Sequence, residues 1–135
     1  MPSCCQPHQS QRFASLGKPH RIWAVGAIHA DVARLAALHD RLFPLLRPGD
    51  RIVYTGNYTG YGAHPLETID ELLAFRSGVL SRPGMLATDI AFLRGGQEEM
   101  GQKILQIQFA TGPADVIKWM GENGFAETVN AYGFS

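Results

Sequence analysis

The chain is poor in cysteine. Its 135 residues include two cysteines, Cys4 and Cys5, and they are adjacent, so neither has a distant thiol with which to pair. This arrangement excludes a disulfide framework, and the Cys/His spacing of a zinc site is also missing. We expect two exposed thiols on a loose amino-terminal tail.

The sequence also lacks an excess of charge and any long apolar run. Basic and acidic side chains balance, 12 against 12, so there is no field that would favour nucleic acid or a membrane surface. No segment reaches the roughly 18 apolar residues of a membrane span. Residues 1–20 do not contain the apolar core of a secretory leader. We therefore expect a cytoplasmic protein that is not transmembrane and does not bind nucleic acid.

What is present is typical of one α/β domain. Apolar residues make up 45% of the chain, which also has 15 glycines and 8 prolines, and this length can bury a moderate core. Residues 1–19 are rich in Gln, Ser, His and Pro, and we expect them to form a flexible tail. The domain then occupies residues 20–135.

Short apolar runs alternate with segments of helical period. The predicted strands are residues 21–25, 51–55 and 89–93, and the predicted helices are about 32–43, from Pro65 onward, about 98–109 and 113–121. Asp31 is expected to cap the first helix, and the second is expected to bury a stripe made of Leu66, Ile69, Leu72, Leu73 and Phe75. The order βαβαβα with right-handed crossovers predicts an α/β fold with a parallel three-stranded sheet and helices on its faces.

A glycine-containing segment follows each predicted strand. The segments are Gly26-Ala27-Ile28-His29-Ala30, Gly56-Asn57-Tyr58-Thr59-Gly60-Tyr61-Gly62 and Arg94-Gly95-Gly96-Gln97-Glu98. The carboxyl ends of parallel strands share one edge of a sheet, where α/β folds usually bind ligands. We therefore expect the three segments to lie along that edge.

In this order, the segments resemble the three amino-terminal motifs of calcineurin-like metallophosphoesterases, best those of the phosphoprotein phosphatase branch, which read GDxHG, GDxxDRG and GNHE. The resemblance covers about Arg21 to Gly133, and residues 119–124 with Thr128 and Tyr132 are similar to bacterial members of that branch. It implies a truncated metallophosphoesterase-like domain over residues 20–135, equivalent to the amino-terminal half of a two-sheet sandwich.

Several positions that carry the chemistry in that family are substituted here. An active member holds two divalent cations, which clamp a phosphate and lower the pKa of a bridging water. The resemblance places the first ligand aspartate on Ala27 and retains the ligand histidine as His29. It places the metal-bridging aspartate on Asn57 and the later Asp-Arg pair of the motif on Gly60 and Tyr61, so the arginine that binds the phosphate is missing.

The third motif is altered in the same way. Its ligand asparagine falls on Gly96, and its catalytic histidine falls on Gln97, which cannot donate a proton at neutral pH. Arg94, Gly95 and Glu98 still match, and we expect them to maintain the loop geometry.

The substitutions predict the absence of a catalytic residue and of a metal site. His29 and Asn57 are the only matching positions with donor atoms, so no cofactor is expected, and Mn, Fe or Zn would bind only in a residual hydrolase. His39 and His64 are expected to be solvated or capping residues.

The leading functional hypothesis is a catalytically inactive metallophosphoesterase-like protein that acts as a binding, scaffold or assembly subunit. Two alternatives remain: an anion or phosphate sensor that uses His29 and Arg94, and a residual metal-dependent phosphoesterase. Because the chain has material for little more than one sheet, a cover is expected for it. This cover is a protein partner, a second copy, or residues 125–134 packed on the sheet or added as a strand.

Overall fold

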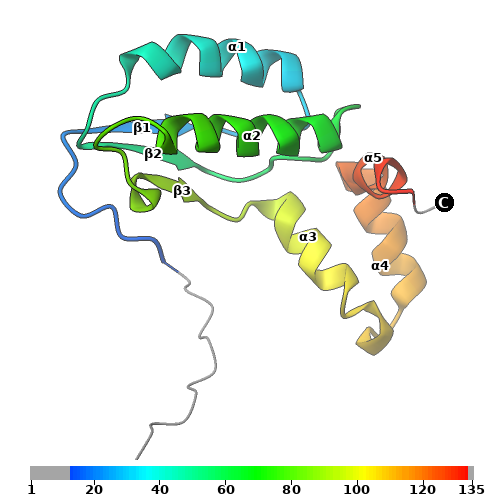
Figure 1. The fold of residues 1–135 in the computed structure, drawn as a ribbon. Helices are drawn as coiled ribbons and strands as arrows, with labels where there is room; N and C mark the ends of the chain where they lie inside the picture. The colour runs from blue at the N-terminus through cyan, green and yellow to red at the C-terminus, as the bar shows by residue number, and fades with distance from the viewer. Residues whose placement is uncertain (1–12, 134–135) are drawn as a thin grey trace, which may run out of the picture.

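A computed structural model describes residues 13–133 and shows a parallel three-stranded sheet (Figure 1). Strands β1 (Arg21–Val25), β2 (Asp50–Tyr54) and β3 (Ile90–Phe92) lie in the order β1-β2-β3. The predicted α/β fold with a parallel sheet is therefore confirmed. Strand β3 is shorter than predicted because Asp89 ends a 3-10 turn, η2 (Ala87–Asp89), in which its carboxylate accepts the N–H of Leu86 at 2.8 Å.

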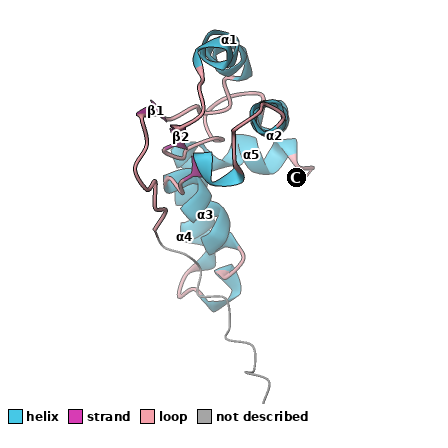
Figure 2. Ribbon diagram, turned by 60° about the vertical axis from the view of Figure 1, so that its left-hand side comes forward, coloured by secondary structure: helices cyan, strands magenta, loops and turns pink. Residues whose placement is uncertain are grey.

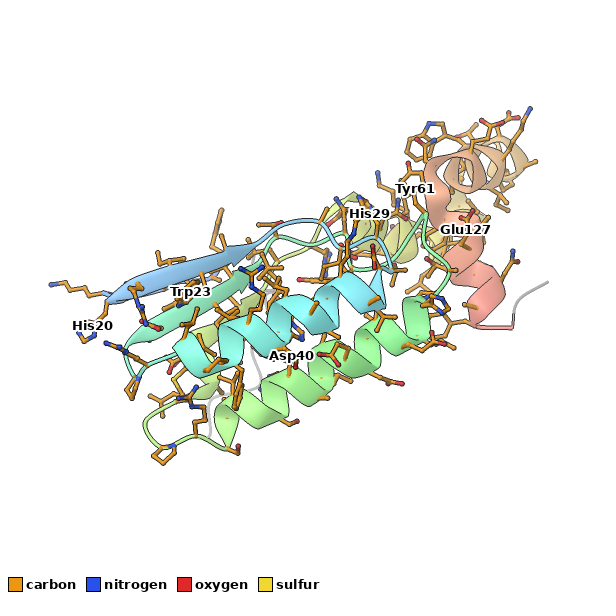
Figure 3. All side chains as sticks on the ribbon, turned by 90° about the horizontal axis from the view of Figure 1, so that it is seen from above. His20, Trp23, His29, Asp40, Tyr61 and Glu127 are labelled. Atoms are coloured by element: carbon orange, nitrogen blue, oxygen red, sulfur yellow. The ribbon has the colours of Figure 1, made fainter. Side chains whose placement is uncertain are left out.

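Helices α1 (Val32–Leu42) and α2 (Pro65–Leu80) pack side by side against one face of the sheet (Figure 3). Strands that follow one another in order, joined by crossovers of the same hand, place both helices on the same side. Residues Ile52 and Tyr54 on that side are almost completely buried, whereas Ile22 on the other side is 53% exposed. The prediction of helices on the sheet faces thus holds for one face only.

The core lies between the sheet and these two helices. Apolar side chains from both layers form one buried cluster that includes Val25, Leu35, Leu42, Ile52, Tyr54, Leu72, Phe75, Val79 and Ile90. Asp31 caps α1 as predicted, because its carboxylate accepts the N–H of Arg34 at 3.1 Å. The 3-10 turn η1 (Phe43–Leu45) follows the helix directly, with Pro44 at its start.

The predicted buried stripe of α2 is wrong in part. Leu72 and Phe75 are buried, but Leu66 is 39% exposed, Leu73 is 56% exposed, and Ile69 is half-buried. The apolar side chains of α2 therefore face two directions, the core and a second surface near the carboxyl-terminal helices.

The carboxyl-terminal third forms helices beyond the carboxyl ends of the strands (Figure 1). These elements are α3 (Gly96–Ile104), η3 (Ile107–Phe109), α4 (Pro113–Met120), the kinked segment η4 (Gly121–Phe125) and α5 (Ala126–Ala131). The predicted helix over 98–109 is thus interrupted after Ile104. The sequence allowed residues from Phe125 onward to add a strand or to pack on the sheet. In the structure the described part of this segment continues as α5 and packs on α2.

His39 is buried, so the expectation of a solvated histidine is wrong. Its Nδ1 lies 2.6 Å from Glu71 Oε1, its Nε2 lies 2.9 Å from the Tyr54 hydroxyl, and its ring stacks on Phe75 with centroids 3.8 Å apart. His39 faces α2, and Glu71 of that helix supplies the carboxylate. The sequence pattern did not predict this pairing. His64 is exposed, as expected, at the start of α2.

The predicted amino-terminal tail is described only from Phe13. Residues 13–19 have no regular structure, and the carbonyl of Leu16 accepts a hydrogen bond from Arg51 Nε at 3.2 Å. Cys4 and Cys5 lie outside the described residues. Among the helices of residues 13–133, none is long and apolar enough to span a membrane.

Candidate functional site

The three glycine-containing segments meet at the carboxyl edge of the sheet, as the topology predicted. The backbone carbonyl of Asn57 accepts the N–H groups of Ile28 at 3.0 Å and His29 at 2.9 Å, which joins the first loop to the second. The side-chain oxygen of Asn57 accepts the N–H of Gln97 at 3.0 Å, which joins the second loop to the third. Asn57 therefore connects all three loops.

Glu98 reinforces the same junction. Its carboxylate accepts the backbone N–H groups of Asn57 at 2.7 Å, Tyr58 at 2.9 Å and Gly95 at 2.8 Å. A Cβ at Gly95 would collide with the backbone nitrogen of Asn57, so the two loops approach as closely as they do only because this residue has no side chain. Gly95 and Glu98 thus have the structural role that we expected.

Four non-glycine residues of these loops have a left-handed backbone. The φ angles are 50° at His29, 56° at Ala30, 55° at Asn57 and 61° at Tyr61. Such conformations cost about 1–3 kcal/mol each and are found where the surrounding structure holds them in place. Here the holding contacts include the hydrogen bonds to the Asn57 carbonyl and the one from Ala30 N–H to the Tyr58 carbonyl at 2.9 Å.

His29 and Tyr61 lie next to each other on this edge (Figure 3). Their rings make an edge-to-face contact with centroids 5.3 Å apart, and His29 Nδ1 is buried without a hydrogen-bond partner among residues 13–133. The backbone N–H of Tyr61 donates to the Gly124 carbonyl at 3.0 Å, which ties the second loop to η4. The neighbouring positions Ala27 and Gly96 have no side-chain donor atoms.

Arg94 makes its contacts on the other side of the third loop. Its guanidinium lies 3.4 Å from the carboxylate of Glu99 and also contacts Gln102, both on α3. These three side chains border a hollow of about 1010 Å³ next to β3, which His29 does not line. The structure therefore gives Arg94 an acidic neighbour.

The residues at the edge do not fit a two-metal centre. Such a centre needs several carboxylate and imidazole ligands whose lone pairs are free. The side-chain oxygens of Asn57 and Glu98 instead accept backbone N–H groups. Between residues 13 and 133 there is no cluster of three or more His, Cys, Asp or Glu side chains that would hold a metal ion.

An apolar cavity of about 600 Å³, which was not predicted from the sequence, lies behind the second and third loops. Gln97 lines it, with apolar side chains from α2, α3, η4 and α5. Two signals in the sequence point to it: the wide apolar surface of α2 and the apolar spacing of Phe125, Val129 and Tyr132. Only the packing of α5 on α2 shows that the two surfaces face the same space.

Comparison of the chain with protein-family models, with curated proteins and with solved structures found no match. The structure itself shows a small α/β domain with a βαβαβ core. The resemblance to metallophosphoesterases therefore depends on the sequence motifs, and it stays a prediction.

Proposed function

We propose that this chain is a catalytically inactive metallophosphoesterase-like domain that acts as a binding or assembly subunit. Two features support the loss of catalysis: Ala27 and Gly96 lack donor atoms, and the oxygens of Asn57 and Glu98 are used to hold the loops together. A hydrolase of the family that this chain resembles would need metal ligands at positions 27, 57 and 96.

The observation that carries the binding role is a group of exposed apolar side chains on the segment from α3 to α4, residues 96–120, which we call the arm. Figure 2 shows α3 and α4 extending away from the sheet. Leu105 and Phe109 are 78% and 80% exposed, and Ile117 and Trp119 are both more than half exposed. Apolar patches of this kind usually mark surfaces that bind another protein, and aromatic residues are enriched there.

The activity part of the proposal is tested with p-nitrophenyl phosphate in the presence of Mn²⁺. We expect no hydrolysis above that of buffer with metal, and no difference between the wild-type protein and His29→Ala. Hydrolysis that depends on Mn²⁺ and disappears in His29→Ala would contradict the proposal and favour the residual phosphoesterase. The binding part is tested by light scattering on the pure protein and by identifying what co-purifies, in stoichiometric amount, with the untagged protein from its own cells.

One observation favours a phosphate sensor as the second candidate. His29 Nδ1 is buried without a partner at the sheet edge, where an anion that accepted a hydrogen bond would satisfy it. Calorimetric titration with inorganic phosphate distinguishes this candidate, which predicts saturable binding that is lost in His29→Ala and not in Arg94→Ala, since Arg94 faces Glu99.

A further inference from the structure

The cavity behind the loops has an apolar wall that is partly in contact with solvent. Its volume is about 600 Å³, and its apolar lining from α2, α3, η4 and α5 consists of Ile69, Ile104, Leu105, Phe125, Val129 and Tyr132. Among residues 13–133, the one charged residue of the lining is Glu98, whose carboxylate accepts three backbone N–H groups. Leu105 and Tyr132 are 78% and 52% exposed. The group that fills this cavity must therefore be apolar and uncharged.

The end of the arm has the same chemical character. Residues 104–114, which we call the tip, contain no charged side chain, although Lys103 and Asp115 flank them directly. Within the tip Phe109 is 80% exposed, and Figure 2 shows the turn between α3 and α4 at the end of the arm that points away from the sheet. The cores of protein interfaces are depleted of charge and enriched in aromatic residues. The exposed tip and the cavity therefore match each other.

The spacing of three residues along the arm allows two copies of the chain to exchange their tips. Gly101 and Leu105 lie four residues apart and both line the cavity. Phe109 lies four residues beyond Leu105. In a two-fold dimer, residue i of one copy contacts residue j of the other, and j contacts i. With the axis near Leu105 and the arms antiparallel, Phe109 of each copy faces Gly101 of the other, where the absence of a side chain leaves room for the ring.

The area available is of the order that a stable dimer needs. Leu105, Phe109, Trp119 and Tyr132 are all more than half exposed. Since an aromatic side chain buries about 150–250 Å² when it is fully covered, these four would bury on the order of 500 Å² in each copy. The walls of the cavity would add to this area, and a standard interface buries about 800 Å² per partner.

We propose that the partner of this domain is a second copy of the chain, and that Phe109 of each copy occupies the apolar cavity of the other beside Gly101, across a two-fold axis near Leu105. The proposal rests on the binding role proposed above and specifies the partner. Each cavity is then completed by a side chain of the other copy, which accounts for the lack of charge at both the tip and the cavity.

Light scattering on the full-length protein over a range of concentrations should show a reversible dimer. Phe109→Ser removes the ring and Gly101→Leu fills its site, so each should weaken dimerisation at least about tenfold, as the loss of an interface anchor does. Circular dichroism and thermal unfolding establish that the variants are folded.

Two matched controls should retain the dimer of the wild type. Phe13→Ser removes a phenylalanine that is 84% exposed and lies outside the arm. Gly101→Ala adds a methyl group 3.7 Å from the Phe125 ring, an ordinary contact that leaves most of the cavity open.

A disulfide cross-link tests the position of the axis. In protein that carries Cys4→Ser and Cys5→Ser, Leu105→Cys should form a covalent dimer under mild oxidation, because the two copies of residue 105 face each other across the axis. Leu73→Cys, at an exposed position on α2, is the matched control and should stay monomeric in non-reducing denaturing electrophoresis.

The proposal is overturned if Gly101→Leu is folded and dimerises as the wild type does, or if Leu73→Cys cross-links as readily as Leu105→Cys. A wild-type protein that is monomeric up to millimolar concentration also overturns it. If that monomer co-purifies with a different protein in stoichiometric amount, the second copy is wrong and the binding role stands, whereas a monomer without a partner contradicts both. A monomer that releases a stoichiometric apolar compound on denaturation would assign the cavity to a small ligand instead.

Discussion

At the scale of single residues, His39 connects two polar side chains in the core, those of Glu71 and Tyr54. If Nδ1–H donates to Glu71, then Nε2 accepts from the Tyr54 hydroxyl, so a neutral imidazole satisfies both partners. Burial lowers the pKa of His39 despite the opposing hydrogen bond to Glu71, which agrees with that neutral form. Burial also raises the pKa of Tyr54, so its hydroxyl stays protonated and able to donate.

The first prediction concerns the removal of this ring. His39→Ala should lower the free energy of unfolding by about 2–4 kcal/mol, because it creates a cavity beside Phe75 and leaves the Tyr54 hydroxyl without its partner. Urea denaturation followed by circular dichroism measures the change. His64→Ala is the control and should change stability by less than about 0.5 kcal/mol, since that side chain is exposed. A loss below about 1 kcal/mol in His39→Ala would contradict the buried network.

The second prediction is a dependence of stability on pH in two steps. Because the pKa of His39 is lower in the folded protein, the unfolded chain binds more protons, and stability should fall as the pH drops through about 6.5. The hydrogen bond from Arg21 lowers the pKa of Asp50 to about 2, so a further loss should begin as the pH falls below about 4.

Urea denaturation at a series of pH values checks both steps. His39→Gln should flatten the upper step and keep the lower one, whereas Asp50→Asn should do the reverse. An upper step of unchanged size in His39→Gln would assign it to another group.

At the scale of elements, the carboxylate of Glu98 holds the second and third loops together at the sheet edge. Glu98 lies at the start of α3, and its carboxylate accepts N–H groups from Asn57 and Tyr58 in the second loop, which is distant in the sequence, and from Gly95 in its own loop. The strained backbone at His29, Ala30, Asn57 and Tyr61 depends on such contacts, because these conformations are not stable by themselves. Glu98 therefore stabilises the arrangement of the whole edge.

The third prediction follows from that role. Glu98→Ala should lower the free energy of unfolding by about 2–3 kcal/mol, because three backbone N–H groups lose a charged acceptor. Glu99→Ala is the matched control, since the neighbouring carboxylate is about half exposed and pairs with Arg94 on the surface. The free energies of unfolding of the two variants, measured by chemical denaturation, should differ by more than about 1.5 kcal/mol. Equal values would contradict the stabilising role of the Glu98 hydrogen bonds.

The positions of the helices and strands were largely predictable from the sequence, but which of their side chains are buried was not. The strand at 21–25 and the helix starts at Val32, Pro65 and Pro113 follow from apolar periodicity, an N-cap and proline, all of which act locally. The burial of His39 and the exposure of Leu73 depend on which side of each helix meets a partner. Periodicity gives the pattern of apolar residues but does not identify the element that covers them.

At the scale of the whole molecule, two surfaces with exposed apolar side chains stand out within the described residues. One is the face of the sheet opposite α1 and α2, where Ile22 is exposed although Val53 is buried, and the other is the arm with Phe109 and Trp119. From the sequence we expected a partner or a second copy to cover the sheet, and the structure has no contact that tests this expectation. The arm exposes the larger number of large apolar side chains.

The fourth prediction distinguishes these surfaces. If the arm is the interface, the double substitution Phe109→Ser with Trp119→Ser should shift the protein to monomer by light scattering, or release the co-purifying partner, and Ile22→Lys should have no effect. If the sheet face is the interface, Ile22→Lys should give the monomer or release the partner, and the double substitution should have no effect. Each variant should unfold within about 1 kcal/mol of the wild type, because these side chains are exposed. A wild-type protein that is monomeric and partner-free would contradict the binding role.

The sequence by itself determined the α/β class, the parallel sheet and the meeting of the three loops at one edge, because apolar period, turn residues and crossover handedness act through local backbone geometry. Only the tertiary structure decided that both helices lie on one face, that His39 is buried, and which three backbone N–H groups the Glu98 carboxylate accepts. It alone revealed the cavity that Gln97 lines. These features depend on contacts between residues far apart in the chain, and those contacts form only when the helices and strands pack together.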